Sequence, residues 1–423
     1  MKQIPGGPDF RRFFVGHAAS LLGSSMAPLA LAFAVLGTGA GSSGLGLVMA
    51  ARIVPIVLML LLGGVFADRL GGRKVMLASD AGRCVVQGVL AVVLLGRPAL
   101  WELVVLVAAW GVGEAVFSPS RDALVPALTE GGALAGANSL LSVAASAASV
   151  AGPALAGLLV ATTGPATVIA VDAATYAVSF LALLGLRLPA PPAGAARTIA
   201  ADLRDGWSEF RSRTWIWVTS AQMGLFNLLV WAPFLVLGPV VARQRLGGAG
   251  SWGAVMAVYG TGAVISSLLM LGRRPRRPVL VATAATAGWA LPSAALAADR
   301  SVPWICAAAL VAGAGSTVSM VLWTTATQRA VPPEALARVS AYSTLGAFAF
   351  GPLGLAAAGP LASAVGTRTV LGFGALWQAV SVAVVLALPA IRNCAASRSG
   401  PSGEKPPPAG QTLFVFATTG PVG

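Results

Sequence analysis

A stretch without any charged residue, from Phe13 to Ala51, limits what this chain can fold into more than any other feature. An α-helix needs about 20 apolar residues to cross the hydrocarbon core of a bilayer, and comparable apolar runs recur along most of the chain. Hydrophobic residues make up 57% of the sequence and charged residues only 10%, well below the roughly 25% of a soluble domain. The sequence therefore predicts an all-α polytopic membrane protein. It lacks the alternation of apolar and polar residues that a membrane β-barrel needs.

The apolar runs predict twelve transmembrane helices in two sets of six. The first set is expected near residues 14–36, 45–67, 75–96, 101–120, 138–161 and 165–187. The second set is expected near residues 215–241, 252–272, 278–298, 302–323, 341–365 and 369–390. The corresponding domains are an N-terminal half (1–187), a cytoplasmic linker (188–214), a C-terminal half (215–391) and a disordered cytoplasmic tail (392–423).

Two sequence patterns support this division into halves. The order Gly152-Pro153 then Gly164 in the first half recurs as Gly351-Pro352 then Gly366 in the second, at about half the chain length. The linker segment from Thr198 to Arg213 has apolar residues at three- and four-residue spacing, which predicts an amphipathic helix on the membrane surface. This helix is either a tether between the halves or a binding site for a partner.

The net charge of +14 is interpreted as a topology signal and not as a nucleic-acid site. Lys and Arg residues concentrate in loops on alternate sides of the apolar segments, as the positive-inside rule requires. This bias places both termini in the cytoplasm and leaves only Arg52 and Arg83 within helices. We expect a multi-pass plasma-membrane protein, a monomer, whose partners are the lipid bilayer and a small-molecule substrate.

The charged loop between the second and third apolar runs carries the most specific motif. It reads Gly-Val-Phe-Ala-Asp-Arg-Leu-Gly-Gly-Arg-Lys over residues 64–74. Together with residues 117–126 and 323–332, it resembles the major facilitator superfamily over residues 10–390, most closely the bacterial enterobactin- and macrolide-efflux-type exporters. The resemblance implies two pseudo-symmetric six-helix halves that rock about a midplane site.

In this family the loop motif acts as a conformational latch that holds the halves together in the outward-open state. Its expected members here are Gly64, Asp68, Arg69, Gly71, Arg73, Lys74 and Asp122. Asp68 is expected to face the start of the eleventh helix near Ser340, and Arg73 to reach Asp122. The alternative is a solvated positive-inside loop without such contacts.

The fifth helix contains Gly152, Pro153 and Gly157, which resemble the antiporter motif of exporters. Proline removes a backbone donor and kinks the helix, and small residues allow a close approach to the opposite half. A plain packing kink is the alternative. The motif is the main reason to expect export and not uptake.

Ionisable residues inside the apolar runs are candidates for proton coupling, because charges at this depth face the protein interior and need partners. They are Arg52, Asp80, Arg83, Glu114 and Asp172. Similar depth suggests the pairs Arg52 with Asp172 and Arg83 with Glu114, with Asp80 one turn from Arg83. Each pair is expected to be a static lock, a substrate contact or a proton site. Glu114 is the preferred proton carrier.

Polar and aromatic residues on the first, fourth, seventh and tenth helices are the substrate-cavity candidates that the resemblance implies. They are His17, Ser24, Trp110, Gln222, Asn227, Trp231 and Trp323. His17 serves equally well as a packing residue. The sequence contains no nucleotide-binding loop and no metal-ligand spacing, so no cofactor, no metal site and no catalytic residue are expected.

The combined prediction is a proton-coupled exporter, not an enzyme, that moves a hydrophobic or amphiphilic molecule such as a drug, a siderophore or a secondary metabolite. The alternatives are an uptake permease for a nutrient or organic anion and a membrane scaffold or sensor that does not transport.

Overall fold

The computed structural model describes residues 7–59, 72–129, 134–186, 207–270, 273 and 275–392. Within these ranges, twelve helical segments are long and apolar enough to cross a membrane, and no strand occurs. The predicted number of spans and the all-α class are therefore confirmed. Four residues of the loop motif, Gly64, Asp68, Arg69 and Gly71, lie outside the described residues, as do most of the linker and the predicted tail.

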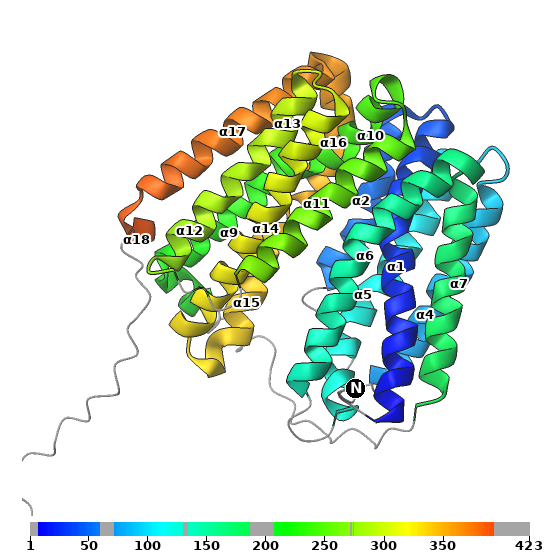
Figure 1. Cartoon of the computed structure of the whole chain (residues 1–423), viewed down its shortest axis with the longest axis horizontal. Coiled ribbons are helices and arrows are strands. Elements are labelled where there is room, and N and C mark those ends of the chain that lie inside the picture. Colours follow the sequence, from blue (N-terminus) through cyan, green and yellow to red (C-terminus); the bar gives the residue numbers. More distant parts are fainter. Residues whose placement is uncertain are drawn as a thin grey trace, which may run out of the picture.

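The first group of six helices lies on one side of the molecule (Figure 1). It comprises α1 (Pro8–Gly37), α2 (Gly41–Met59), α4 (Gly72–Val93), α5 (Leu100–Ala127), α6 (Leu134–Thr163) and α7 (Pro165–Leu184). The helix α1 packs on α6 and α7, and α5 packs on α2 and α4.

The second group lies on the other side and is less regular (Figure 1). It comprises α9 (Thr214–Phe226), η2 (Asn227–Trp231), α10 (Ala232–Arg245), α11 (Ala249–Leu269), α12 (Pro278–Ala285), η3 (Thr286–Trp289), α13 (Ala290–Ala297), α14 (Val302–Ala330), α15 (Pro333–Phe348), α16 (Gly351–Val365), α17 (Thr367–Ala387) and α18 (Pro389–Arg392). The span Thr214–Arg245 contains the π-helical turn η2, and the span Pro278–Ala297 contains the 3-10 turn η3.

Two glycines close matching helix junctions in the two groups. Gly164 precedes α7 with φ 92°, and Gly366 precedes α17 with φ 88°. Residues with a Cβ rarely adopt this left-handed region, so glycine is the residue that permits a tight turn here. The shared junction gives the internal sequence repeat a structural counterpart.

The two groups meet through helix crossings that only small residues allow. On α2, a Cβ atom added to Gly46 would collide with the carbonyl oxygen of Leu355 on α16, and one added to Gly359 of α16 would collide with Ser43. On α6, a Cβ at Gly157 would lie 2.8 Å from the carbonyl oxygen of Ala249 on α11. Such close crossings maximise van der Waals contact where lipid supplies no hydrophobic drive for association.

These crossings lie toward the end of the molecule away from the N-terminus (Figure 1). At this end Arg243 of α10 also donates a hydrogen bond to the carbonyl oxygen of Leu36, in the last turn of α1. A cation is favoured there because carbonyl groups at a helix C-terminus carry partial negative charge. Toward the N-terminal end the two groups diverge, with α15 well separated from α5 and α6 (Figure 1).

The end of the predicted surface helix contacts the second group. Residues 207–212 are helical, and the rings of Trp207 and Phe210 lie 5.4 and 6.0 Å from the ring of Tyr342 on α15. The rest of this predicted helix lies outside the described residues, and its role as a tether stays a prediction.

We expect the Gly157→Ala variant to be less stable than the unmodified protein. The added methyl group would meet backbone atoms, 2.8 Å from Ala249 O and 3.0 Å from the Cα of Gly253, and overpacking of this kind costs about 1–3 kcal/mol. Thermal unfolding of the purified protein in detergent measures the effect. Gly88→Ala is the matched control, because a Cβ at this membrane-embedded glycine meets nothing within 4 Å. An equal melting temperature for both variants would contradict the proposed tight crossing.

Candidate functional site

A partly exposed ion pair links α2 and α5 in the first group. Arg52 donates from Nε to Glu114 Oε2 at 3.0 Å and from Nη2 to Oε1 at 3.1 Å, so the guanidinium and carboxylate groups bind side by side. The guanidinium carbon also lies 4.0 Å from the ring centroid of Trp110. The Arg52 side chain is 17% exposed and that of Glu114 is 33% exposed. This pair is therefore reachable from outside the protein core.

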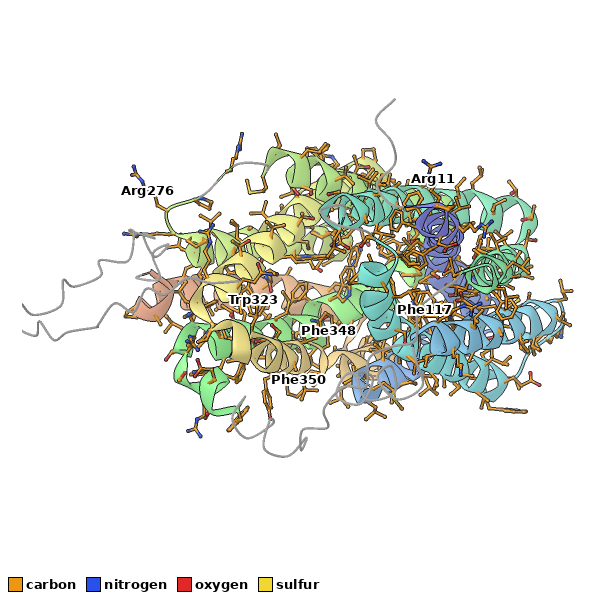
Figure 2. The ribbon with its side chains drawn as sticks, turned by 90° about the horizontal axis from the view of Figure 1, so that it is seen from below. Arg11, Phe117, Arg276, Trp323, Phe348 and Phe350 are labelled. Atoms are coloured by element: carbon orange, nitrogen blue, oxygen red, sulfur yellow. The ribbon has the colours of Figure 1, made fainter. Side chains whose placement is uncertain are left out.

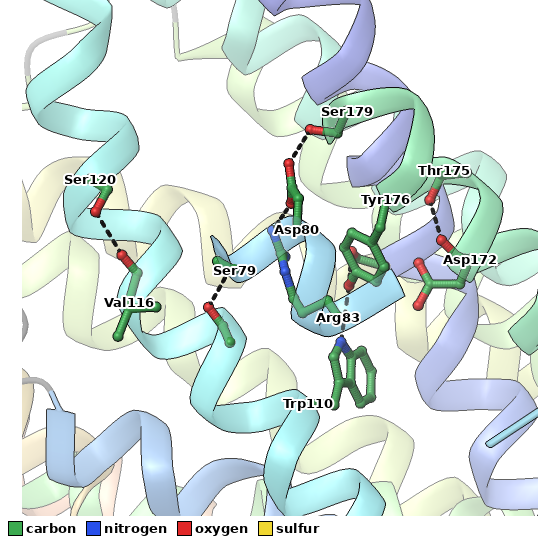
Figure 3. A network of polar contacts seen from close by, with 12 residues as sticks. Ser79, Asp80, Arg83, Trp110, Val116, Ser120, Asp172, Thr175, Tyr176 and Ser179 are labelled. Atoms are coloured by element: carbon green, nitrogen blue, oxygen red, sulfur yellow. Dashed lines mark hydrogen bonds and ion pairs between the residues drawn. The ribbon is translucent and has the colours of Figure 1, made fainter. Parts of the chain in front are cut away.

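A second ion pair is fully buried on α4. Arg83 pairs with Asp80 one turn earlier on the same helix, and Ser179 of α7 donates to the other carboxylate oxygen at 2.6 Å (Figure 3). The Arg83 guanidinium also lies over the rings of Phe117 and Tyr176, at 4.2 and 4.3 Å. The Asp80 charge and the two ring faces offset part of the loss of water around this arginine, whose Nε is buried without a hydrogen-bond partner.

Asp172 of α7 lies near these pairs without joining either of them. Gln87 of α4 donates to its Oδ2 at 2.6 Å, and its Oδ1 is buried without a hydrogen-bond partner. The neighbouring hydroxyl of Tyr176 accepts a hydrogen bond from Trp110 Nε1 at 2.9 Å and shares another with Ser24. Ser24 and Trp110, predicted to line the substrate cavity, are thus parts of this network. Figure 3 shows Trp110 beside Tyr176.

The predicted pairings of the buried charges are wrong. We expected Arg52 with Asp172 and Arg83 with Glu114, whereas the structure pairs Arg52 with Glu114 and Arg83 with Asp80. Depth along a helix was inferred from sequence, but the direction in which each residue points around the helix axis depends on packing. The sequence did select all five residues that the structure gathers in this half.

Arg73 of the loop motif contacts α7. Its described hydrogen bonds go to backbone carbonyl oxygens and not to an acidic residue. It donates from Nε to the carbonyl oxygen of Leu183 at 3.1 Å and from Nη2 to that of Leu184 at 2.9 Å, at the C-terminus of α7. Lys74 is exposed. The side chain of Asp122, the predicted partner of Arg73, lies outside the described residues.

The motif formed by Gly152, Pro153 and Gly157 lies on α6, the fifth transmembrane helix, and contacts two neighbouring helices. A Cβ at Gly152 would meet Ser25 of α1 in the same group, whereas Gly157 lies against α11 of the opposite group. Pro153 lies inside α6, and its carbonyl oxygen would be 2.6 Å from a Cβ at Gly253 of α11. The motif therefore lies where the two groups touch.

The second group contains a cavity of about 410 Å³ between α9, α12, η3, α14, α15 and α17. Among the described residues its walls carry no charged side chain, but they contain hydroxyl and amide groups. They belong to Thr219, Ser220, Gln222, Thr283, Thr286, Ser316, Ser319, Thr324, Ser343, Thr344 and Gln378. Trp289, Trp323, Phe226 and Phe348 supply aromatic walls. In size and character this is a small-molecule pocket.

Only two of the predicted cavity residues, Gln222 and Trp323, line this pocket. His17 is buried between the rings of Phe13 and Phe117 in the first group, at 5.5 and 5.8 Å. Asn227 donates to the carbonyl oxygens of Met223 and Ala347, and Trp231 packs on Trp289 at 4.5 Å. The sequence analysis did not predict that Gln378, Ser220 and Ser343 line the cavity. The sequence indicated them only as amide or hydroxyl side chains within apolar runs.

Comparisons with known proteins all find membrane transporters. The model of the Major Facilitator Superfamily matches residues 13–354. The multidrug efflux pump Tap of Mycobacterium tuberculosis is 28% identical over 420 residues, covering 93% of this chain and 96% of Tap. The staphyloferrin A transporter of Staphylococcus aureus is 24% identical over 266 residues, covering 61% of this chain and 66% of that transporter.

Among solved structures, the nucleoside transporter NupG is similar with a TM-score of 0.71 at 14% identity. The similarity covers 90% of this chain and 99% of NupG. At this level of identity it bears on the fold alone, and it agrees with twelve spans in two groups.

We expect Asp80→Asn to destabilise the protein strongly and Glu114→Gln to do so weakly. Removing the Asp80 charge leaves the buried Arg83 without a counter-charge, which costs about 3–5 kcal/mol. Arg52 is more exposed than Arg83, so neutralising its partner Glu114 destabilises the protein less. Melting temperatures of the two purified variants measure the difference. Equal destabilisation would contradict the assignment of the Arg83–Asp80 pair as a static lock.

Proposed function

The chain belongs to the Major Facilitator Superfamily, and on this premise we propose that it exports hydrophobic or amphiphilic small molecules by proton antiport. Drugs, siderophores and secondary metabolites are the expected substrate classes. The efflux pump Tap, similar over 93% of this chain, supports export, and the partly exposed Arg52–Glu114 pair supports proton coupling. The pair is the observation that carries the mechanism.

Glu114 is the proposed proton carrier because it is the reachable carboxylate of the network in the first group. Its side chain is 33% exposed, whereas Asp80 and Asp172 are completely buried. A proton carrier must exchange protons with water on each side of the membrane in turn. Exposure of the side chain therefore favours Glu114 over Asp80 and Asp172. Asp80, held by Arg83 and Ser179, acts as a structural lock.

The position of the pair couples protonation to movement of the two groups. Arg52 lies on α2, which packs against α16 of the second group. Its own backbone is in tight contact with α5, since a Cβ at Gly111 would collide with the carbonyl oxygen of Arg52. Loss of the Glu114 charge therefore loosens the α2–α5 contact on a helix that also forms the junction between the groups.

The energies of the interactions around Arg52 favour a conformational change after Glu114 is protonated. An arginine at mid-bilayer costs about 2.5–3.5 kcal/mol on insertion scales, and the Glu114 carboxylate offsets this while it is charged. Once Glu114 is neutral, the Trp110 ring offers Arg52 about 0.5–2 kcal/mol. The imbalance biases the protein toward another arrangement, and release of the proton restores the pair.

The remaining assignments follow from the charge bias and the loop motif. We place both termini in the cytoplasm of a plasma-membrane monomer, so the arrangement in Figure 1, which diverges at the N-terminal end, is open to the cytoplasm. In this state Arg73 of the loop motif donates to α7 within its own group and does not bridge to the second group through these bonds. The halves 1–187 and 215–391 rock about their crossings as rigid units.

We expect Glu114→Gln to lose transport driven by a pH gradient and to keep substrate exchange without a gradient. The amide keeps the shape of the side chain but cannot release a proton. Proteoliposomes with an imposed pH gradient, tested with a panel of amphiphilic drugs and siderophores, measure proton movement triggered by substrate.

Glu102→Gln is the matched control on the same helix. Glu102 accepts a hydrogen bond from the backbone N–H of Ala99 at 2.8 Å at the start of α5, away from Arg52. This variant should transport normally. Gradient-driven transport by Glu114→Gln at the unmodified rate and with unmodified pH dependence would refute the proton-carrier assignment.

A further inference from the structure

Three buried polar atoms without partners belong to residues that line the cavity of the second group. They are Ser220 Oγ on α9, Ser343 Oγ on α15 and Gln378 Oε1 on α17. The three residues are 4%, 3% and 1% exposed, and all three line the cavity. Buried polar groups in proteins are nearly always hydrogen-bonded, because an unmade bond is costly. Three such atoms on three helices around one cavity point to a ligand that supplies the missing bonds.

Gln378 determines part of the chemistry of this ligand. Its Nε2 donates to the carbonyl oxygen of Thr286 at 2.8 Å, within the 3-10 turn η3. This bond fixes the orientation of the amide, so the unpartnered Oε1 is an acceptor only. The ligand must therefore carry a hydrogen-bond donor, such as a hydroxyl or an amide N–H. The hydroxyl groups of Ser220 and Ser343 can then donate to an acceptor on the same ligand.

The aromatic walls present their apolar faces to the cavity because their polar atoms are already bonded. Trp289 Nε1 donates to Ser316 Oγ at 2.6 Å, and Trp323 Nε1 donates to Thr219 Oγ1 at 2.9 Å. The indole rings consequently provide apolar surface for the body of a ligand.

The described walls of the cavity contain no charged side chain that could neutralise a charged ligand. A cation would lose its water and gain no counter-charge from these walls, so its desolvation is not repaid. The charged residues Arg52, Glu114, Asp80, Arg83 and Asp172 belong to the other group of helices.

The cavity opens toward the space between the two groups. Phe348, which is 48% exposed and lines the cavity, lies between Trp323 of the second group and Phe117 of the first in the view from the diverging end (Figure 2). Met320, also in the wall, is 73% exposed. These exposed wall residues give a ligand access to the cavity from the surface of the second group.

We propose that the cavity of the second group is a substrate subsite for uncharged amphiphiles that carry at least one hydroxyl or N–H donor, recognised by Gln378, Ser220 and Ser343. The inference rests on the proposed export function and adds its substrate class. Substrate selection then takes place in one half of the protein, and proton coupling in the other.

A matched series of dyes on one ring system tests the proposal. Nile red is uncharged without a donor, 2-hydroxy Nile red adds one hydroxyl donor, and Nile blue is a cation. Saturable binding to the full-length protein in nanodiscs is measured from dye fluorescence, with empty nanodiscs subtracted and without any gradient. We expect 2-hydroxy Nile red to bind about tenfold more tightly than Nile red, a difference of about 1.4 kcal/mol, and Nile blue to bind most weakly.

The Gln378→Leu variant should bind 2-hydroxy Nile red about tenfold more weakly and Nile red as before. Because this change also removes the bond to Thr286, the Ser220→Ala/Ser343→Ala double variant provides an independent test that keeps this bond. The double variant should bind Nile red and 2-hydroxy Nile red several-fold more weakly, because both dyes carry a carbonyl group to which the serine hydroxyls can donate. Ser293→Ala is the matched control: Ser293 Oγ is also buried without a partner, but it lies on α13 and not among the cavity walls.

Tightest binding of Nile blue, equal binding of the three dyes, or no saturable binding would overturn the subsite. So would an equal effect of Ser293→Ala and the cavity variants. These outcomes are distinct from failure of the export proposal, which is decided by gradient-driven transport and by Glu114. Transport that persists in both cavity variants, with unchanged dye binding, would place the substrate elsewhere and leave export standing.

Discussion

The two helix groups are joined by backbone-to-backbone crossings that tolerate no side chain. In a bilayer, apolar side chains gain little by leaving lipid for protein, so helices associate where small residues let their backbones approach. Gly46 and Gly359 perform this role between α2 and α16, and Gly157 and Gly253 between α6 and α11. These contacts lie toward one end of the molecule (Figure 1). The divergence at the other end, and any rocking motion, depend on them.

Polar chemistry is distributed unequally between the groups. The first holds the Arg52–Glu114 and Arg83–Asp80 ion pairs and the buried Asp172, which accepts a hydrogen bond from Gln87. Figure 3 shows Arg83, Asp80 and Asp172 with Trp110 and Tyr176. The second holds an uncharged cavity with hydroxyl and amide groups. The helix α2 carries Arg52 and also packs against α16, so in the proposed mechanism a change of charge in the first group acts on the junction with the second. The proposed separation of proton coupling from substrate recognition follows from this arrangement.

Helical irregularities accompany the cavity. The 3-10 turn η3 contributes Thr286 and Trp289 to its walls, and the π-helical turn η2 begins at Asn227 beside it. In each place an amide side chain satisfies backbone carbonyl groups, Gln378 at Thr286 and Asn227 at Met223 and Ala347. Irregular backbone is tolerated within a membrane span where protein groups replace the missing bonds.

The sequence by itself determined the twelve spans, the two groups and the set of ionisable residues inside them, because length and hydropathy decide whether a helix can lie in lipid. Tertiary structure alone decided which charges pair and where a ligand pocket forms. Arg52 meets Glu114 and not Asp172, and Trp110 lies under the Arg52 guanidinium, because these contacts depend on the rotation of each helix about its axis. Gln378 became recognisable as part of a site only when packing left its carbonyl oxygen unpartnered beside Ser220 and Ser343.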